Sequence, residues 1–371
     1  MPPRGALDSS RGETARSIRA VPARVSAHRH VPEPKLRAPA SEPMTDRSPA
    51  RPSFTVVRAD LAHTAADPSL NGAVVAIGNF EGVHRGHRAV IAVAQARARA
   101  LSRKAAVLTF EPHPRAVFNP DEPVFRLSDE PAKLRLLAGT GLDGAIVMRF
   151  DTALAALSAE DFVRRILVER FAVAGVVVGF DFHFGKGRAG SPDFLEAAGR
   201  RHGFTVDIVP PFSDDGRRIS SGAIRAALAA GELETAADLL GYPWFVTGAV
   251  VHGDKRGRGL GFPTANLRLD PACGLKHGVY AVRVGLNGAR HDGVANFGRR
   301  PMFDSGVVLL EVFLFDFNAE IYGATLDVAF IHWIRPELNF ATVADLVRRM
   351  DEDCGLARAA LARMPDAFPP I

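Results

Sequence analysis

Cysteine is scarce in this sequence, and long apolar runs are missing. The 371 residues include only two cysteines, Cys273 and Cys354, which lie far apart and form no metal-type or redox-type spacing. This usage gives no sign of a disulfide framework and predicts a protein of the reducing cytoplasm. No stretch approaches the roughly 20 consecutive apolar residues that a membrane-spanning helix needs, so we expect no membrane partner.

Positive charge is concentrated at the start of the chain. Residues 1–50 hold nine Lys or Arg and five Asp or Glu, a net charge of +4, whereas the whole chain carries only +5. The rest of the chain is therefore nearly neutral, which argues against a dedicated nucleic-acid binder in spite of a pI of about 9.5. A basic tail can still touch nucleic acid or a membrane surface.

The first fifty residues predict no fold of their own. Seven prolines between Pro2 and Pro43 forbid a long helix, and no apolar period is sustained. We therefore predict that residues 1–50 are a disordered basic tail. The segment lacks the apolar central run of a secretory signal. A more ordinary start follows Met44, and we hypothesise that translation begins there; the intact mass of natively expressed protein decides this.

Residues 54–241 alternate short apolar runs with helical patterns. Near-continuous apolar strands between helices indicate a parallel sheet covered on both faces, which is an α/β domain. Ligands of such sheets bind at the carboxyl ends of the strands. The expected strands are 73–77, 105–110, 144–150, 174–180 and 204–209, and the expected helices are about 87–102, 128–138, 158–170 and 191–201.

Residues 242–371 show a different pattern, with strand-like runs separated by glycine, asparagine and proline turns. This pattern predicts a small closed β-barrel. One amphipathic helix is expected to end the chain, with Thr342 as its cap. Its apolar residues are spaced at i, i+3, i+4 and i+7; they are Val343, Leu346, Val347 and Met350.

The segment from Gly78 to His87, GNFEGVHRGH, is the first candidate site. It follows a predicted buried strand, and its glycines let the backbone approach a ligand closely. His84 and His87 fall at the entry of the next helix, where N–H groups and the helix dipole favour an anion. Two imidazoles there can bind phosphate oxygens and stabilise a departing pyrophosphate. The alternative is a strand-to-helix turn with two surface histidines.

Two further segments follow later strands. In GFDFHFGKGRAG, Asp181 sits at a strand end, where it can hydrogen-bond a base or ring edge, and Lys186 and Arg188 lie on a glycine-rich loop suited to phosphates. In ISSGAIRAAL, Ser220 or Ser221 can cap a helix that carries Arg225 one turn in, which makes an anion site. The alternatives are a solvated basic turn and an ordinary cap with a surface arginine.

The C-terminal half contains a basic, glycine-rich loop, HGDKRGRGLGFPTANL. It can fold over ATP phosphates through Lys255, Arg256 and Arg258, although it lacks the glycine-Lys-Ser/Thr order of a P-loop. Thr264 and Asn266 follow at alternate positions of an extended segment, and their oxygens suit Mg²⁺. A hairpin loop with solvated basic residues is the alternative.

Glu311 lies within a very apolar predicted strand, VVLLEVFLFDF. Because an unpaired buried carboxylate is costly, an acidic residue at this place needs a reason. It is either a functional group or a charge on the solvated face of the barrel, since alternate residues of a strand point outward.

These N-terminal segments resemble those of the bacterial bifunctional riboflavin kinase/FMN adenylyltransferases, also called FAD synthetases. His84, Gly86 and His87 match the family's histidine motif, and Glu81 stands where the family usually has Asp. The family's Ser-Ser-Thr segment becomes Ser220, Ser221 and Gly222, and Arg225 matches. The segment TFEPHP (109–114) also matches. The resemblance implies a Rossmann-like nucleotidyltransferase domain over residues 54–241.

The C-terminal half resembles the family's riboflavin kinase domain, which the resemblance assigns to residues 242–371. Its Pro-Thr-x-Asn segment is Pro263, Thr264, Ala265 and Asn266 here. The family's Asn-x-Gly-x-x-Pro-Thr begins at Asn296 and ends in Met302 instead of Thr. Phe313 replaces the family's histidine two residues after the matching glutamate, Glu311.

The resemblance implies that riboflavin and ATP give FMN, and that FMN and a second ATP give FAD and pyrophosphate. Glu311 would take the proton of the riboflavin hydroxyl, and Mg²⁺ would bridge phosphate oxygens in the adenylyltransferase half. The metal ligands in the kinase half would be Thr264 and Asn266, and its ATP site would include Gly259, Gly261 and Pro263. The ATP site of the adenylyltransferase would comprise His84, His87, Gly78, Asn79, Phe80, Gly86, Ser220, Ser221 and Arg225, with Asp181 binding flavin or nucleotide.

Two other functions are compatible with parts of the sequence. The histidine motif also suits an adenylyltransferase for another phosphorylated small molecule, with the barrel as an accessory. A flavin-binding regulator whose basic tail contacts nucleic acid is the non-catalytic alternative. The sequence leaves the oligomeric state open, a weak homo-oligomer included.

Overall fold

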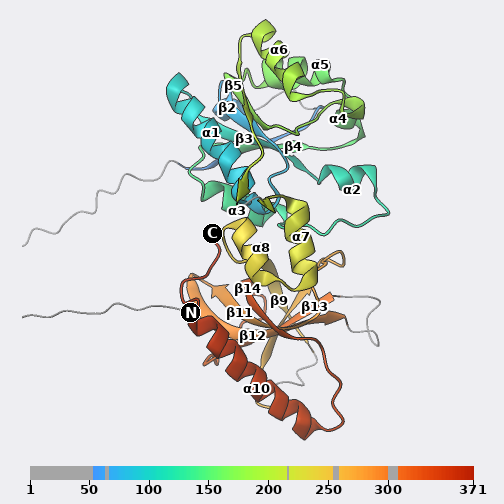
Figure 1. Ribbon diagram of the computed structural model, residues 1–371, viewed down its shortest axis with the longest axis vertical. Coiled ribbons are helices and arrows are strands. Elements are labelled where there is room, and N and C mark those ends of the chain that lie inside the picture. The colour runs from blue at the N-terminus through green and yellow to red at the C-terminus, as the bar shows by residue number, and fades with distance from the viewer. Residues whose placement is uncertain (1–52, 63–66, 215–216, 254–258, 300–307) are drawn as a thin grey trace, which may run out of the picture. The chain divides into compact units, whose positions relative to one another are not determined.

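The computed structural model describes residues 53–62, 67–214, 217–253, 259–299 and 308–371 (Figure 1). Several predictions fall outside these ranges. They concern the tail 1–50 with Met44, the loop residues Lys255, Arg256 and Arg258, and Met302.

The first half of the described chain is built on a six-stranded sheet with the strand order β1-β4-β3-β2-β5-β6. All of its neighbouring strands are parallel. The strands are β1 (Thr55–Ala59), β2 (Val74–Ile77), β3 (Ala105–Glu111), β4 (Gly144–Arg149), β5 (Gly175–Gly179) and β6 (Thr205–Val209). The chain turns to opposite sides of β2, with β3 on one side and β5 on the other, and such a switch point opens a crevice for ligands.

Both faces of this sheet are covered. In β2, Val74 and Ala76 belong to one apolar cluster, whereas Val75 and Ile77 belong to a second. Alternate residues of a strand face opposite sides, so the continuous apolar run reflects burial on both. The helices are η1 (Pro68–Leu70), η2 (Glu81–Val83), α1 (Arg85–Leu101), α2 (Pro114–Phe118), α3 (Glu130–Ala138), α4 (Thr152–Ala155), α5 (Ala159–Asp161), η3 (Phe162–Arg170), η4 (Lys186–Arg188), α6 (Pro192–His202), α7 (Ser221–Ala230) and α8 (Leu233–Leu240). A short hairpin pairs β7 (Ser213–Asp214) with β8 (Arg217–Arg218).

The predicted α/β class is confirmed, since each expected strand corresponds to one of β2 to β6. The edge strand β1 and the helix α8 were not predicted. The sequence of β1, TVVRA, alternates buried and exposed residues and is too short to stand out. An edge strand gains its place from pairing with β4, which no local pattern reveals.

The second half forms the predicted closed barrel, in the order β10-β13-β12-β11-β14-β9. Its strands are β9 (Phe245–Val251), β10 (Thr264–Leu269), β11 (Gly278–Leu286), β12 (Ala289–Arg299), β13 (Val308–Leu314) and β14 (Thr325–Arg335). In β13 the buried residues Val308, Leu310, Val312 and Leu314 alternate with half-buried ones. The apolar set fills the barrel, and the other set faces outward.

The predicted terminal helix is α10 (Val343–Ala362), and Thr342 caps it by accepting a hydrogen bond from Asp345 N–H at 3.1 Å. The apolar face expected at its start is only partly buried: Val343 is 61% exposed, whereas Leu346, Val347 and Met350 are half-buried. The helix is instead anchored further along, where Asp353 is buried with Arg335 of β14 at 2.6 Å. Its remaining buried residues are Ala357, Ala360 and Leu361.

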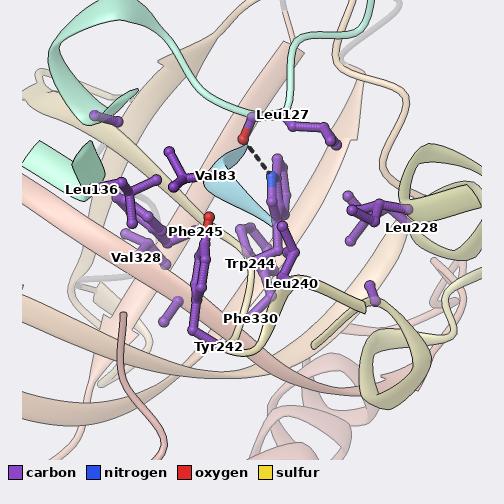
Figure 2. Packing of buried hydrophobic residues seen from close by; sticks show 14 of the residues in the cluster. Val83, Leu127, Leu136, Leu228, Leu240, Tyr242, Trp244, Phe245, Val328 and Phe330 are labelled. Atoms are coloured by element: carbon purple, nitrogen blue, oxygen red, sulfur yellow. Dashed lines mark hydrogen bonds between the residues drawn. The ribbon is translucent and has the colours of Figure 1, made fainter. Parts of the chain in front are cut away.

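One apolar cluster runs from the α/β half into the barrel. Figure 2 shows Val83 and Leu127 of the first half packed near Trp244 and Phe330 of the second, with the Trp244 indole donating to the Leu127 carbonyl at 2.8 Å. Trp244 also stacks on Phe330 at 5.3 Å between ring centroids. The two halves therefore share core residues rather than meeting only through polar surfaces.

Candidate active sites

A cavity of about 900 Å³ opens at the carboxyl end of the parallel sheet. Residues at the ends of β2, β3, β5 and β6 line it, together with the starts of α1 and α7. The three N-terminal motifs therefore meet in one site, although they lie far apart in the chain. The predicted residues that line this cavity are Gly78, Asn79, Phe80, His84, Gly86, His87, Asp181, Ser220, Ser221 and Arg225.

Two of the helices that begin at the cavity, α1 and α7, are capped by predicted site residues. At the start of α1, His84 Nδ1 accepts a hydrogen bond from His87 N–H at 3.2 Å. At the start of α7, Ser220 Oγ accepts one from Ala223 N–H at 3.2 Å, so Ser220 is the cap and Ser221 the first helical residue. Helix N-termini attract anions, and here two of them border one cavity.

The imidazole rings of His84 and His87 are stacked, with centroids 3.6 Å apart. Burial lowers the pKa of His84 from its ordinary 6.5 to about 4. Burial, then the neighbouring His84 and Lys133, also bring the pKa of His87 well below its ordinary value. Both rings are therefore neutral at pH 7. Because His84 Nδ1 accepts a hydrogen bond, the proton of its neutral ring is on Nε2, which can donate to a ligand.

Glu81 forms a buried polar cluster with Arg225 and His113. Its Oε2 pairs with Arg225 Nη2 and lies 3.7 Å from His113 Nε2. Arg225 is held a second time, because its Nε donates to the carbonyl of Phe125 at 2.6 Å. Burial lowers the pKa of His113 below its ordinary value. The segment TFEPHP contained His113, but its position beside Glu81 could not be predicted from the sequence.

The second motif lies at the cavity mouth. Asp181 is exposed and forms an ion pair with Arg218 at 2.5 Å, and the guanidinium of Arg218 lies 5.3 Å from the ring centroid of Phe180. Arg188 lines the cavity, whereas Lys186 is not part of its lining. Of the two basic residues that the glycine-rich loop suggested for phosphates, the cavity therefore includes only Arg188.

Aromatic rings that the sequence did not single out form part of the lining. Phe118 is 62% exposed and packs edge-on against Phe150 at 5.6 Å, and Phe150 packs edge-on against Phe110 at 5.8 Å. Phe180 and Phe212 are further exposed rings of the same cavity. Large exposed apolar rings gathered in a concave site are typical of a binding surface for a flat ligand.

Lys133 of α3 is a buried residue that contacts the backbone of the first motif. It is 2% exposed and pairs with Glu111 at 2.6 Å, while Arg126 holds the same carboxylate at 2.7 Å. Its ammonium also donates to Thr109 Oγ1 at 3.2 Å and to the carbonyl of Asn79 at 3.4 Å. Burial lowers the pKa of Lys133, although Glu111 acts in the opposite direction. A lysine in a helical pattern predicts a surface residue, so no local signal pointed to the burial of Lys133.

The barrel brings the second set of predicted residues into one row. Glu311 of β13 is paired directly with Asn266 of β10 on one side and with Asn296 of β12 on the other. Directly paired residues of antiparallel strands project from the same face. All three lie on the outer face, because Leu310 and Val312 fill the interior. The sequence indicated Asn296 only as the first residue of a motif, and its position beside Glu311 was not predicted.

Thr264 is two residues before Asn266 on β10 and pairs with Phe313 of β13. The two residues therefore share a face, as predicted for alternate positions of an extended segment. Asn266 is 6% exposed and donates from Nδ2 to the carbonyl of Thr264 at 3.4 Å. Gly259, Gly261 and Pro263 are exposed on the segment that leads into β10. Gly261 has φ +89°, a conformation that favours glycine.

Within the described ranges, no group of three or more His, Cys, Asp and Glu side chains has the arrangement of a metal site. Nor does any helix of these ranges combine the length and the apolar character that a bilayer crossing requires.

Two family models match the chain. One is described as FAD synthetase and matches residues 66–223, and the other is described as riboflavin kinase and matches residues 240–361. The first match contains the histidine motif and the second contains Thr264, Asn266 and Glu311. Each half of the chain is thus similar to a different known domain.

Curated relatives match both halves at once. Bifunctional riboflavin kinase/FMN adenylyltransferases of Haemophilus influenzae and Pseudomonas fluorescens are each 42% identical, over 298 and 296 residues. These matches cover 79% and 80% of this chain, and 96% and 95% of the relatives. The protein of the same description from Listeria monocytogenes is 41% identical over 297 residues, which is 79% of this chain and 94% of the relative.

A solved structure from Streptococcus pneumoniae, described as a macrolide-efflux protein, has a TM-score of 0.72 and 31% identity. The match covers 81% of this chain and 98% of that chain. Its description names a different class of protein from the curated relatives. The two family models agree with the curated relatives, and they do so independently in the two halves.

Proposed function

The chain belongs to the family of bifunctional riboflavin kinase/FMN adenylyltransferases, and we propose that it makes FAD from riboflavin and ATP in two steps. Residues 242–371 phosphorylate riboflavin to FMN, and residues 54–241 adenylylate FMN to FAD. The observation that carries the proposal is the convergence of three separate polar motifs on one cavity at the switch point of the sheet, while Glu311 and its neighbours form a second group on the barrel.

In the adenylyl transfer, an oxygen of the FMN phosphate attacks the α-phosphorus of ATP. A new P–O bond forms, the bond to the bridging oxygen breaks, and pyrophosphate leaves. Positioning and charge stabilisation are sufficient, and no covalent enzyme intermediate is needed. The neutral rings of His84 and His87 support this role, because they can donate hydrogen bonds to the leaving phosphates from a buried position.

The nucleotide is proposed to lie across the starts of α1 and α7. Ser220, Ser221 and Arg225 hold its phosphates, and the backbone from Gly78 to Phe80 contacts it closely. Support comes from the two capped helix N-termini at the cavity and from the guanidinium of Arg225, which Glu81 fixes in orientation. Phosphate binding beside a fixed guanidinium needs little reorganisation.

The isoalloxazine ring of FMN is proposed to lie on the aromatic part of the cavity. Phe118 of α2 offers exposed ring surface and packs edge-on against the half-buried Phe150, which follows β4, so a flat apolar ring can stack there. Asp181 at the mouth can accept a hydrogen bond from a ring edge or base. Its ion pair with Arg218 keeps the carboxylate at that place.

In the kinase step, Glu311 takes the proton of the riboflavin 5′-hydroxyl. The hydroxyl oxygen then attacks the γ-phosphorus of ATP in line, and ADP leaves. The segment with Gly259, Gly261 and Pro263 binds the ATP phosphates. The pairing of Glu311 with Asn266 supports this assignment, since the base and the proposed metal ligand then share one face of the barrel.

Magnesium is proposed as the metal of both reactions. The donor set of the kinase half fits this ion, because Thr264 and Asn266 offer uncharged oxygens next to the carboxylate of Glu311. Mg²⁺ needs only one or two protein ligands when phosphates supply the others, which agrees with the lack of a larger acidic cluster in the described ranges. When bound, it neutralises charge that develops on the transferred phosphoryl group.

We further propose that the enzyme works in the cytoplasm. Cys273 and Cys354 are both free thiols, as a reducing compartment favours.

The direct test is a product analysis by chromatography. Purified protein with riboflavin, ATP and Mg²⁺ should yield FMN first and FAD later, and FMN supplied alone with ATP should yield FAD and pyrophosphate. Absence of both flavin products would refute the proposal. If the protein formed no FAD but adenylylated another phosphorylated acceptor, the result would favour the alternative adenylyltransferase.

A further inference from the structure

The loop that leads into the histidine motif has a strained backbone. Phe80, Gly82 and Val83 have φ values of +49°, +63° and +37°. Positive φ is unfavourable for residues with a side chain and more so for a β-branched one such as Val83. Such conformations persist only where surrounding contacts fix them, and they cluster at functional sites. The contacts that fix this loop are therefore part of the site.

Hydrogen bonds hold the backbone of this loop from several directions. Gly82 N–H donates to Ser128 Oγ at 3.0 Å, and Arg88 Nε donates to the carbonyl of Val83 at 3.1 Å. The carbonyl of Gly82 accepts a hydrogen bond from the hydroxyl of Tyr242. Tyr242 lies in the segment that matches the riboflavin kinase model, whereas the loop lies in the segment that matches FAD synthetase.

The side chain of Tyr242 is fixed by burial and by contacts with its neighbours. Its side chain is 6% exposed, its ring packs against Phe245 at 6.2 Å, and the guanidinium of Arg88 lies 5.4 Å from its centroid. Burial raises the pKa of Tyr242, so the phenol remains a hydrogen-bond donor. Figure 2 shows it within the cluster of Val83, Leu240 and Phe245.

The loop has no room to relax toward this cluster. A side chain at Gly82 would meet Leu240 at 3.1 Å and Leu127 at 3.3 Å. Leu127 is itself fixed by the indole of Trp244, two residues after Tyr242. Two neighbouring residues at the start of the barrel thus fix two segments of the α/β half.

We propose that Tyr242 is a positioning residue for adenylyl transfer, acting from the kinase half of the chain. Its hydroxyl holds the left-handed turn at Gly82, and that turn sets where His84 begins α1 and where the stacked imidazoles face the cavity. Tyr242 is not part of the cavity lining. The inference rests on the proposed function, because it assigns Tyr242 to the step that His84 and His87 serve.

The test is Tyr242→Phe in the full chain, which keeps the ring and removes the hydroxyl. For FMN adenylylation, kcat/KM for ATP should fall about tenfold, the effect of one lost hydrogen bond on a reacting complex. KM for FMN and the rate of riboflavin phosphorylation should stay within about twofold of wild type. The matched control is Tyr280→Phe, because Tyr280 is also buried and its hydroxyl also donates to a backbone carbonyl, that of Lys276. This control should leave adenylylation unchanged.

Equal losses of both activities, or an unchanged kcat/KM for ATP, would overturn the proposal, since a merely structural role lowers the folded fraction for both reactions alike. Should Tyr242→Phe not fold, Ser128→Ala removes the bond on the other side of Gly82 and should give the same selective loss. Retention of full adenylylation by Ser128→Ala would then count against it. Wild-type protein that forms no FAD would instead refute the proposed function itself.

Discussion

Asn266 and Glu311 face each other across neighbouring antiparallel strands, so the amide and the carboxylate emerge side by side from the outer face of the barrel. Asn296 continues the row on the other side of Glu311. A proposed base therefore lies between two amides, next to the proposed metal ligands. The pairing of Asn266 with Glu311 connects two motifs, on β10 and β13, that are separated in the chain by β11 and β12.

Glu311→Gln should remove riboflavin phosphorylation selectively. The amide cannot take a proton, and a positioned general base contributes about 100-fold or more to the rate, so kcat should fall by at least that factor. FMN-to-FAD conversion should stay at the wild-type rate. Glu320→Gln, an exposed glutamate of the same half, is the control that should change neither activity. Loss of both activities in Glu311→Gln would argue against separate sites.

Asn266→Ala should change the magnesium dependence of the kinase reaction. Loss of one oxygen ligand should raise the Mg²⁺ concentration for half-maximal rate by about tenfold, measured at constant ATP. FMN adenylylation should keep its magnesium dependence. Asn318→Ala, at an exposed position after β13, serves as the control. An unchanged magnesium titration would remove Asn266 from the metal site.

Replacing His84 and His87 together by Ala should have the opposite selectivity. Loss of donors to the leaving pyrophosphate should lower kcat for FAD formation by roughly 100-fold to 1,000-fold. Riboflavin phosphorylation should continue, so FMN should accumulate. Exposed His202, replaced by Ala, is the control on the same half. Normal FAD formation by the double variant would exclude the histidines from the reaction.

The buried histidines should also make the protein less stable in weak acid. The folded-state pKa of His84, about 4, lies below its ordinary 6.5, so the unfolded chain binds more protons between these values. The contribution of neutral His84 to the free energy of unfolding is present above about pH 6.5 and is lost as the pH falls toward 4. His84→Asn keeps a capping oxygen but removes this titration. From pH 6.5 to 5, wild type should lose about 1.5 kcal/mol more unfolding free energy than the variant.

Urea unfolding at the two pH values measures this difference. His202→Asn, at an exposed position, should lose as much stability in acid as the wild type does. Equal acid sensitivity of wild type and His84→Asn would mean that His84 is not kept neutral in the folded protein.

The architecture was predictable because both halves carry strong local patterns. Continuous apolar runs such as that of β3 predict buried parallel strands, and the strand-like runs between glycine, asparagine and proline turns predict the barrel. The half-exposed face of β13 was not visible in its sequence, because all of its residues except Glu311 are apolar. The anchor of α10 was not predictable, because it is the ion pair of Asp353 with Arg335 on a distant strand. A buried aspartate looks like a surface residue in the sequence.

The cavity residues were predictable where they belong to glycine-rich or capping motifs, as His84 and Ser220 do. Residues that act through tertiary partners were not. Lys133 is buried only because Glu111 neutralises it, and Tyr242 reaches Gly82 from another half of the chain. Local patterns carry no information about such pairings, since they depend on how the strands and helices are placed in space.

The measurement that tests the two-site claim most directly is a mixing experiment with riboflavin, ATP and Mg²⁺. Glu311→Gln alone should leave riboflavin unchanged, and the His84 and His87 double variant alone should stop at FMN. The two variants in one reaction should produce FAD, because FMN made by one chain is adenylylated by the other. A mixture that accumulates FMN without FAD, although Glu311→Gln folds, would contradict two independent sites.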